Sequence, residues 1–354
     1  MILSKLRWSA RPSMYCPSSS VLGTLLLVML WGGIAAKYFD NRASDFNSTK
    51  RDNENFAVLF EENVLRSLGE MDKALLYLRR TLQTATAPLD LHAVVGTSDV
   101  LSDLIVQVAI IDEHGIMRAS NVGPQPAPAT DLSDREHFRA HVDSAEDRLF
   151  VSKPLIGRAS GKWSVQLTRR FLKRDGSFGG VVVASFNPDH FAKFYGRVDL
   201  GVGAAFTLFG RDGIVRATGG NRDTRYALGE MMSGALMAHI KLDRPEAFIE
   251  SPEKSGASRL VAVRPVANHP LIVSVSVPEN SIFEESRANL RLMMFAGLAL
   301  SLMIAVVTWQ ARRSELAVKR NSRQLQLTLD HMSQGIMMVM DDLHIPIMNA
   351  KCVE

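Results

Sequence analysis

The apolar residues of this chain form two long uncharged stretches near its ends, with short alternating runs between them. One stretch of sixteen residues runs from Val21 to Ala36, and one of eighteen runs from Leu292 to Trp309. A helix needs roughly 20 apolar residues to cross a bilayer, so both stretches are predicted membrane spans, the first extended by the serines before it. Between 50 and 85 the sequence predicts a long amphipathic helix, because apolar residues recur there at helical spacing: Phe56, Leu59, Val64, Leu65, Leu68, Met71, Leu75 and Leu78.

The segment between the two stretches contains an internal repeat. Val106 to Ser120 and Ala204 to Thr218 each read as a strand, a glycine turn and a second strand, and they match at an offset of 98 residues. The same offset sets Phe150, Pro154, Ala159 and Ser160 against Phe248, Pro252, Ala257 and Ser258. The last apolar strands, 181–186 and 271–277, follow at an offset of 90. Each copy is therefore expected to form an α+β lobe with an antiparallel sheet, not a parallel βαβ sheet.

The distribution of charge orients the two spans. The chain has 41 Lys and Arg against 37 Asp and Glu, and the whole excess lies outside residues 37–291, which hold 32 of each sign. No basic domain exists to bind nucleic acid. Basic residues dominate both ends of the chain, so the positive-inside rule places both termini in the cytoplasm and residues 37–290 outside it. A cleaved signal peptide is the alternative reading of the first stretch, and it leaves the middle segment outside.

The cysteine count limits the kind of domain that lies between the spans. The chain has two cysteines, Cys16 and Cys352, both near the termini. A disulfide framework and a cysteine-based metal site are therefore excluded for the middle segment. That segment must be stable through a packed core.

Two spans that enclose a long helix and tandem α+β lobes resemble the double Cache sensor domain of bacterial membrane receptors. The resemblance covers roughly residues 40–285. Four phrases resemble a Cache subgroup joined to cytoplasmic PAS and cyclic-di-GMP enzyme domains: SDREHFRAH (133–141), LFVSKPLIGRASGKWSVQLTRR (149–170), DGSFGGVVVASFNPDHFAKFY (175–195) and FGRDGIVRA (209–217). The resemblance implies that the membrane-distal lobe holds a small-molecule ligand and that the proximal lobe relays its effect.

This reading divides the chain into segments. We expect a cytoplasmic N-terminus (1–20), a transmembrane helix (21–36), a periplasmic sensor (37–290, with a long helix 50–85, a distal lobe 88–200 and a proximal lobe 201–280), a second transmembrane helix (291–310), a cytoplasmic signalling helix (311–332) and the truncated start of a PAS domain (333–354). The apolar spacing of the signalling helix suits a two-stranded seam, and an ordinary amphipathic helix accounts for it nearly as well.

The distal lobe carries side chains suited to a small carboxylate, which Arg forks bind well in a partly dry cleft. The candidate ligand-binding residues are Arg135 and His137 at a helix start, Lys153 and Arg158 in the next loop, Trp163, Gln166 and Arg169 along one strand, and Ser185 on the following strand. The strand of the distal copy carries more side chains suited to binding than its counterpart in the proximal copy, which fits a site in the distal copy. The offset of 98 aligns Trp163, Gln166, Arg169 and Arg170 with Val261, Arg264, Ala267 and Asn268.

Two considerations limit this candidate site. Strand alternation sends Trp163 and Arg169 to one face and Gln166 to the other, so at most one of these sets lines a cavity. Residue by residue, the alternative is that Trp163 is core, that Arg135 pairs with Asp134 or Glu136, and that the other cations are solvated.

The resemblance also bears on the ligand. Amino-acid-binding Cache domains carry an aromatic-Arg-Trp-Tyr cluster and a late-strand Asp that holds the ligand ammonium. The cluster is absent here, and Ser185 stands where that Asp would fall. An anionic or neutral ligand is therefore expected, not an α-amino acid. His137 and His141 have metal-ligand spacing, but Arg135 and Arg139 beside them repel cations, so neither a metal nor a cofactor is expected.

The sequence thus predicts a two-pass receptor of the bacterial inner membrane that acts as a homodimer. The resemblance implies cyclic-di-GMP turnover as the cytoplasmic output, with a histidine kinase as the alternative. No catalytic motif occurs in this chain, so it is not expected to be an enzyme and no catalytic residue is assigned. The competing readings are an output-less membrane-anchored binding protein from a truncated gene, and a secreted hydrolase, which the second span disfavours.

Overall fold

The computed structural model describes residues 19–84, 91, 104–124, 127–144, 146–195, 198, 200–220, 226–251, 258–331, 337–338 and 347–348. The chain divides into two compact units, one of Met1–Arg42 with Glu285–Glu354 and the other of Ala43–Glu284. The predicted α+β fold is confirmed: a long N-terminal helix accompanies two antiparallel sheets, and a candidate apolar helix lies at each end.

The first unit contains the two apolar helical segments. Helix α1 (Ser19–Thr84) begins with one and α8 (Glu284–Asp330) contains the other. Both helices are long and apolar enough to cross a membrane, and only 6% of the most apolar window of each is buried. Within this unit the Trp31 indole donates a hydrogen bond to Ser301 Oγ at 3.2 Å. This exposed apolar surface is consistent with the two predicted spans.

The predicted PAS segment lies largely outside the described residues. Two short strands are described in it, β12 (Met337–Met338) and β13 (Ile347–Met348), and they pair antiparallel.

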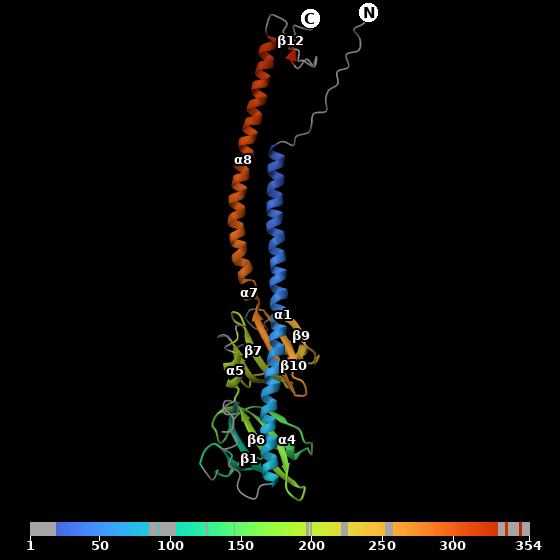
Figure 1. Ribbon diagram of the computed structural model, residues 1–354, viewed down its shortest axis with the longest axis vertical. Helices are drawn as coiled ribbons and strands as arrows, with labels where there is room; N and C mark the ends of the chain where they lie inside the picture. The colour runs from blue at the N-terminus through green and yellow to red at the C-terminus, as the bar shows by residue number, and fades with distance from the viewer. Residues whose placement is uncertain are drawn as a thin grey trace, which may run out of the picture. The chain divides into compact units, whose positions relative to one another are not determined.

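The second unit is built from the rest of α1 and two antiparallel sheets (Figure 1). The distal sheet has the order β3-β2-β1-β6-β5-β4 and comprises β1 (Ile105–Asp112), β2 (Ile116–Ser120), β3 (Thr130–Asp131), β4 (Phe150–Ile156), β5 (Trp163–Leu172) and β6 (Phe178–Phe186). The proximal sheet has the order β8-β7-β11-β10-β9 and comprises β7 (Ala205–Gly210), β8 (Val215–Gly220), β9 (Glu246–Glu250), β10 (Arg259–Pro265) and β11 (Leu271–Pro278). The short helices are α4 (Glu136–Val142), α5 (Asp189–Tyr195), α6 (Gly234–Ile240) and α7 (Glu279–Ile282).

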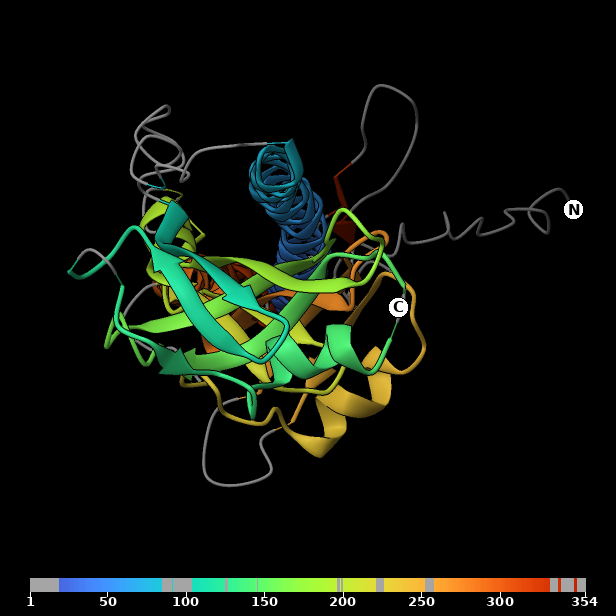
Figure 2. The ribbon, with the colours of Figure 1, turned by 90° about the horizontal axis from the view of Figure 1, so that it is seen from below.

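The sheets are covered by helices on both faces. Helix α1 lies on one face, and α4 and α6 lie on the other, as Figure 2 shows. The buried stripe of α1, which includes Phe60, Val64, Met71 and Leu75, joins alternate residues of both sheets in one core. Leu59 was expected in this stripe, but it is 56% exposed.

The two sheets repeat the same topology, and their registers define which residues correspond. Ile110 pairs with Ala119 and Leu208 pairs with Ala217, so β1 and β2 map onto β7 and β8 at an offset of 98. In the later strands the offset falls, because the connections after the first hairpin are shorter in the proximal lobe. Arg169 pairs with Val182 and Arg264 pairs with Val273, which maps β5 onto β10 at an offset of 95 and β6 onto β11 at 91.

The predicted offset of 98 was therefore wrong for β4 and β5, and the predicted offset of 90 for the last strands differs by one residue from the register. The offset of 98 set Gln166 against Arg264, whereas the register sets Gln166 against Val261 and Arg169 against Arg264. Phe150 likewise corresponds to Glu246, two residues before Phe248.

Candidate ligand-binding site

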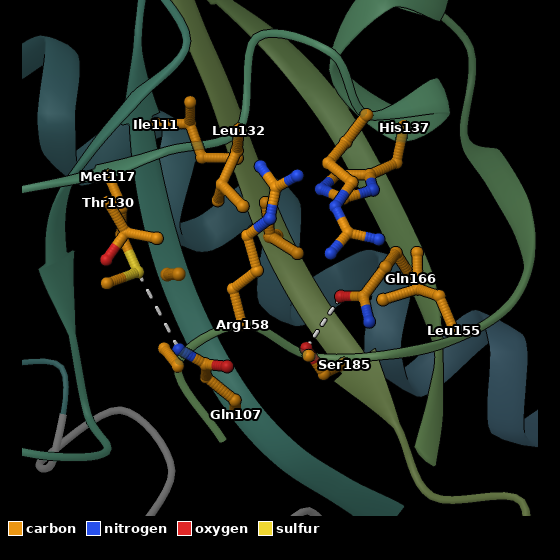
Figure 3. A pocket seen from close by; sticks show the side chains of 15 residues that line it. Gln107, Ile111, Met117, Thr130, Leu132, His137, Leu155, Arg158, Gln166 and Ser185 are labelled. Carbon is orange, nitrogen blue, oxygen red and sulfur yellow. Dashed lines mark hydrogen bonds between the residues drawn. The ribbon is translucent and has the colours of Figure 1, made fainter. Parts of the chain in front are cut away.

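A cavity lies in the distal lobe, on the face of its sheet that α4 covers (Figure 3). Its wall is apolar along β1, β2 and β6, with Ala109, Ile111, Met117 and Val183, and Leu132 and Leu155 add to it. Polar side chains from six segments converge on it: Gln107, Thr130, Arg135, His137, Arg158, Gln166 and Ser185. A volume of about 30 Å³ is open to the centres of water molecules, which is room for about two of them.

Five of the eight predicted site residues line this cavity. They are Arg135, His137, Arg158, Gln166 and Ser185. The structure thus selects the face of β5 that carries Gln166, as strand alternation requires.

The other three predicted residues lie elsewhere. Arg169 is on the α1 side of β5, where its guanidinium binds both carboxylate oxygens of Asp72. Trp163 begins β5 and is 49% exposed, so it is neither in the cavity nor in the core. Lys153 is exposed where the pairing of β4 with β5 shifts register.

Most of the polar groups in the cavity already have protein partners. Ser185 Oγ donates to Gln166 Oε1 at 2.6 Å, and Gln166 Nε2 donates to Ser164 Oγ at 2.9 Å. Gln107 Nε2 donates to Ser120 Oγ at 2.8 Å. These bonds fix the amide side chains along the floor of the cavity.

Arg158 closes one side of the cavity through an ion pair. Its guanidinium donates to both carboxylate oxygens of Asp134 at 2.8 Å and to the backbone carbonyl of Asp131 at 2.5 Å. The Arg158 guanidinium holds the pKa of the Asp134 carboxyl below its usual range. The Asp134 partner predicted for Arg135 is therefore occupied by Arg158.

Two buried nitrogen atoms in the cavity have no hydrogen-bond partner in the described part of the chain. They are Nε of Arg135 and Nδ1 of His137, and His137 is only 3% exposed. Burial, and then the neighbouring Arg135 charge, lower the pKa of His137 to about 4, so the ring is neutral at pH 7. Buried polar groups are almost always paired, so these two atoms mark the cavity as a place where ordered water or a ligand completes the hydrogen bonding.

In the described part of the proximal lobe, apolar side chains occupy the corresponding positions. Val261 stands at the position of Gln166, and it packs with Phe209, Leu236 and Ile272 in a cluster of buried apolar residues. Ser233 begins α6 where Arg135 begins α4, and its hydroxyl accepts from the Leu236 backbone N–H at 3.2 Å. The proximal copy therefore has a conventional core where the distal copy has a polar cavity.

A hydrogen-bonded path connects the cavity to the proximal lobe. Ser152 Oγ accepts from the Gln166 backbone N–H at 2.9 Å, and the Ser152 carbonyl accepts from Arg216 Nε at 3.1 Å. Arg216 belongs to β8 and also binds both oxygens of Asp212, at 2.7 and 3.0 Å. Burial raises the pKa of Asp212, but Arg216 and the Ile214 N–H outweigh it, and the net shift is downward.

Sequence reasoning missed Gln107, Thr130 and the apolar wall. Gln107 had a readable signal, because it is a polar residue in the apolar run IVQVAII of β1. Thr130 belongs to a two-residue strand that no periodicity reveals.

Comparison with known structures places this architecture among extracellular sensor domains. The extracellular domain of a protein described as the histidine kinase rpHK1S-Z16 is 25% identical, with a TM-score of 0.59, and covers 68% of this chain and 98% of its own. The ligand-binding domain of Mlp24 with asparagine is 14% identical, with a TM-score of 0.52, over 70% of this chain and 98% of its own. The ligand-binding domain of the Campylobacter jejuni chemoreceptor Tlp3 with L-valine is 10% identical over 69% of this chain and 98% of its own, with a TM-score of 0.48.

No protein-family model and no curated protein matches the chain. The structural matches nevertheless show that residues 43–284 have the fold of extracellular sensor domains, in agreement with the predicted Cache-type architecture.

Proposed function

We propose that the chain is a two-pass membrane receptor whose distal lobe binds a small molecule outside the cytoplasm. The observation that carries the proposal is the pair of buried, unpaired nitrogens of Arg135 and His137 in a cavity that the proximal lobe fills with apolar side chains. The likeness to extracellular sensor domains supports the same role. The ligand class of the proposal is anionic or neutral, not an α-amino acid.

The receptor topology has both termini in the cytoplasm and residues 37–290 in the periplasm. Labelling with a membrane-impermeant maleimide tests it, in a background with Cys16 and Cys352 replaced by Ser. A cysteine at Lys73→Cys on the exposed face of α1 should react in intact spheroplasts. A cysteine at Arg320→Cys should react only after permeabilisation. The opposite labelling pattern contradicts the topology.

Ligand binding is tested on the full chain in nanodiscs with a broad panel of small molecules. At least one class should raise the unfolding temperature, and Arg135→Gln should abolish that increase. Arg139→Gln is the matched control, because Arg139 lies on the same helix but is exposed. A panel without any stabilising compound contradicts the sensor role.

The proposed output is cyclic-di-GMP turnover, carried by domains outside this chain, with the chain acting as a homodimer and contributing no catalytic residue. This part rests on the resemblance of the local phrases. A histidine kinase is the second candidate, because one of the structural matches is the extracellular domain of a protein described as a histidine kinase. The coding sequence beyond codon 354 distinguishes the two outputs.

A further inference from the structure

The charges around the distal cavity leave one cation without a partner. Among the described residues that line it, Arg135 and Arg158 are the only ones that are charged at neutral pH, and none is Asp or Glu. Asp134 neutralises Arg158 through a bidentate ion pair. Arg135 Nε is buried and has no hydrogen-bond partner in the described part of the chain. Arg135 as a whole is half-buried, and an anionic group in the cavity would pair with its unpartnered guanidinium.

Arg135 does not stabilise helix α4 as a capping residue. It is the N-cap residue and makes no side-chain capping bond. Ser, Thr, Asp or Asn at an N-cap stabilises a helix by about 1 kcal/mol relative to a residue that cannot cap. The proximal lobe has such a residue, Ser233, at the corresponding position. The N-cap position of α4 in the distal lobe is thus occupied by a cation in place of a capping side chain.

The second unpaired atom supplies a neutral polar contact beside this cation. Because the His137 ring is neutral at pH 7, Nδ1 can donate a hydrogen bond in the tautomer that places its proton there. The carboxylate of a ligand that meets Arg135 can accept it. An ammonium group would find no carboxylate among the described residues of the lining.

The remainder of the cavity suits a short aliphatic body. Ala109, Ile111, Met117 and Val183 form the wall, and none of the described lining residues except His137 has a ring. The volume of about 30 Å³ admits the equivalent of about two water molecules. A cavity of this volume suits an alkyl part of a few carbon atoms.

We propose that the ligand of the distal cavity is a short aliphatic monocarboxylate of about two to four carbons. Its carboxylate binds Arg135 and His137, and its alkyl part contacts the wall of β1, β2 and β6. This inference rests on the proposed sensor function and specifies the chemistry of that same site.

Isothermal titration of the full chain in nanodiscs with matched small molecules tests the proposal. The series is acetate, propionate and butyrate, with alanine, propionamide and succinate as single-feature changes, all at one ionic strength. Propionate should bind, and Arg135→Gln should weaken that binding roughly 10- to 100-fold. Arg139→Gln, an exposed change on the same helix, should leave the affinity within about twofold of the parent.

The outcomes separate the ligand class from the sensor function. Binding of propionamide as tight as that of propionate overturns the role of charge. If alanine or succinate binds more tightly than propionate, the ligand is not a monocarboxylate. If Arg135→Gln weakens that binding, the proposed sensor function still holds. Failure of these compounds together with the whole broad panel overturns both. If Arg135→Gln does not fold, Arg135→Lys replaces it, with the affinity for propionate again expected to fall.

Discussion

Arg169 and Arg264 occupy the same position in the two sheets, and each binds a carboxylate of α1. Arg169 pairs with Asp72, and Arg264 pairs with Glu61, which also accepts the Ala267 backbone N–H. Asp72 and Glu61 are eleven residues apart, or about three helical turns, so both carboxylates point from one side of α1. The repeated lobes therefore hold the unrepeated helix by equivalent ion pairs.

The first prediction concerns this pair of contacts. Arg169→Met and Arg264→Met should each lower the free energy of unfolding by about 2 kcal/mol, because each leaves a largely buried carboxylate without its charge-assisted donor. Denaturant titration of the full chain in nanodiscs measures the effect. Lys73→Met removes an exposed ion pair with Glu70 and should cost less than about 0.5 kcal/mol. Equal losses from all three changes contradict the assignment.

The second prediction concerns the link between the lobes. Arg216→Met should lower the free energy of unfolding by about 2 kcal/mol, since it removes the donors to Asp212 and to the Ser152 carbonyl from a buried setting. Arg118 is the corresponding residue of β2, and it pairs with Asp112 but is 61% exposed. Arg118→Met should therefore cost under about 1 kcal/mol by the same titration. A larger loss at Arg118 contradicts the account.

The third prediction concerns pH. Burial, with Arg135 for His137 and with Arg170 and Arg148 for His141, lowers the pKa of both rings to about 4, against about 6.5 in an unfolded chain. The Thr168 hydrogen bond and the carboxylates nearby act in the opposite direction but do not reverse this. The unfolded chain thus takes up protons between pH 6.5 and 4 that the folded chain does not. Stability should be fully present above this window and should fall by about 2 kcal/mol per ring at pH 5.

Melting curves from pH 7 to pH 5 without ligand measure this dependence. Replacing His137 and His141 together by Gln should remove most of it and leave the smaller contribution of His269, whose pKa is also lowered by burial. His114 is exposed, and His114→Gln should leave it unchanged. A flat profile for the parent chain contradicts the neutral, buried state of the two rings.

The fourth prediction concerns two glycines with opposite surroundings. A Cβ at Gly69, inside α1, meets nothing within 4 Å, so Gly69→Ala should stabilise the protein by about 0.5–1 kcal/mol through helix propensity. Gly180 has a φ of 129°, and a Cβ there would lie 2.0 Å from the Ile111 carbonyl oxygen. Gly180→Ala should destabilise by about 2 kcal/mol or more. Thermal and denaturant unfolding of the two variants should shift in opposite directions.

The fold was accessible from the sequence because its signals are local. Helical spacing marked the buried stripe of α1, and the glycine turns of the first hairpins marked the repeat. Gly115 and Gly213 both adopt positive φ, 85° and 81°, which other residues rarely do, so this part of the repeat stays readable. The predicted correspondence then failed from β4 onward, because the shorter connections of the proximal lobe shift the register and no turn motif shows how many residues they lack.

The site was only partly accessible, because a cavity depends on the faces of several strands. Alternation along β5 separated Arg169 from Gln166 correctly, yet it could not say which face α1 would cover. The apolar stripe of α1 could not predict this face either, because Asp72 and Glu61 have no sequence feature that distinguishes them from solvent-exposed acidic residues. The partner of Asp134 was missed because Arg158 comes from a loop 24 residues later.

The two lobes differ in how well their buried polar atoms are paired. In the distal lobe Arg135 Nε and His137 Nδ1 have no protein partner in the described part of the chain, whereas the cluster around Val261 in the proximal lobe is apolar. Native-state amide hydrogen exchange without ligand should therefore show weaker protection in the distal lobe than in the proximal lobe. Under the proposed sensor function, the ligand would add stability to one of two otherwise similar lobes, so that binding would change the difference in rigidity between them.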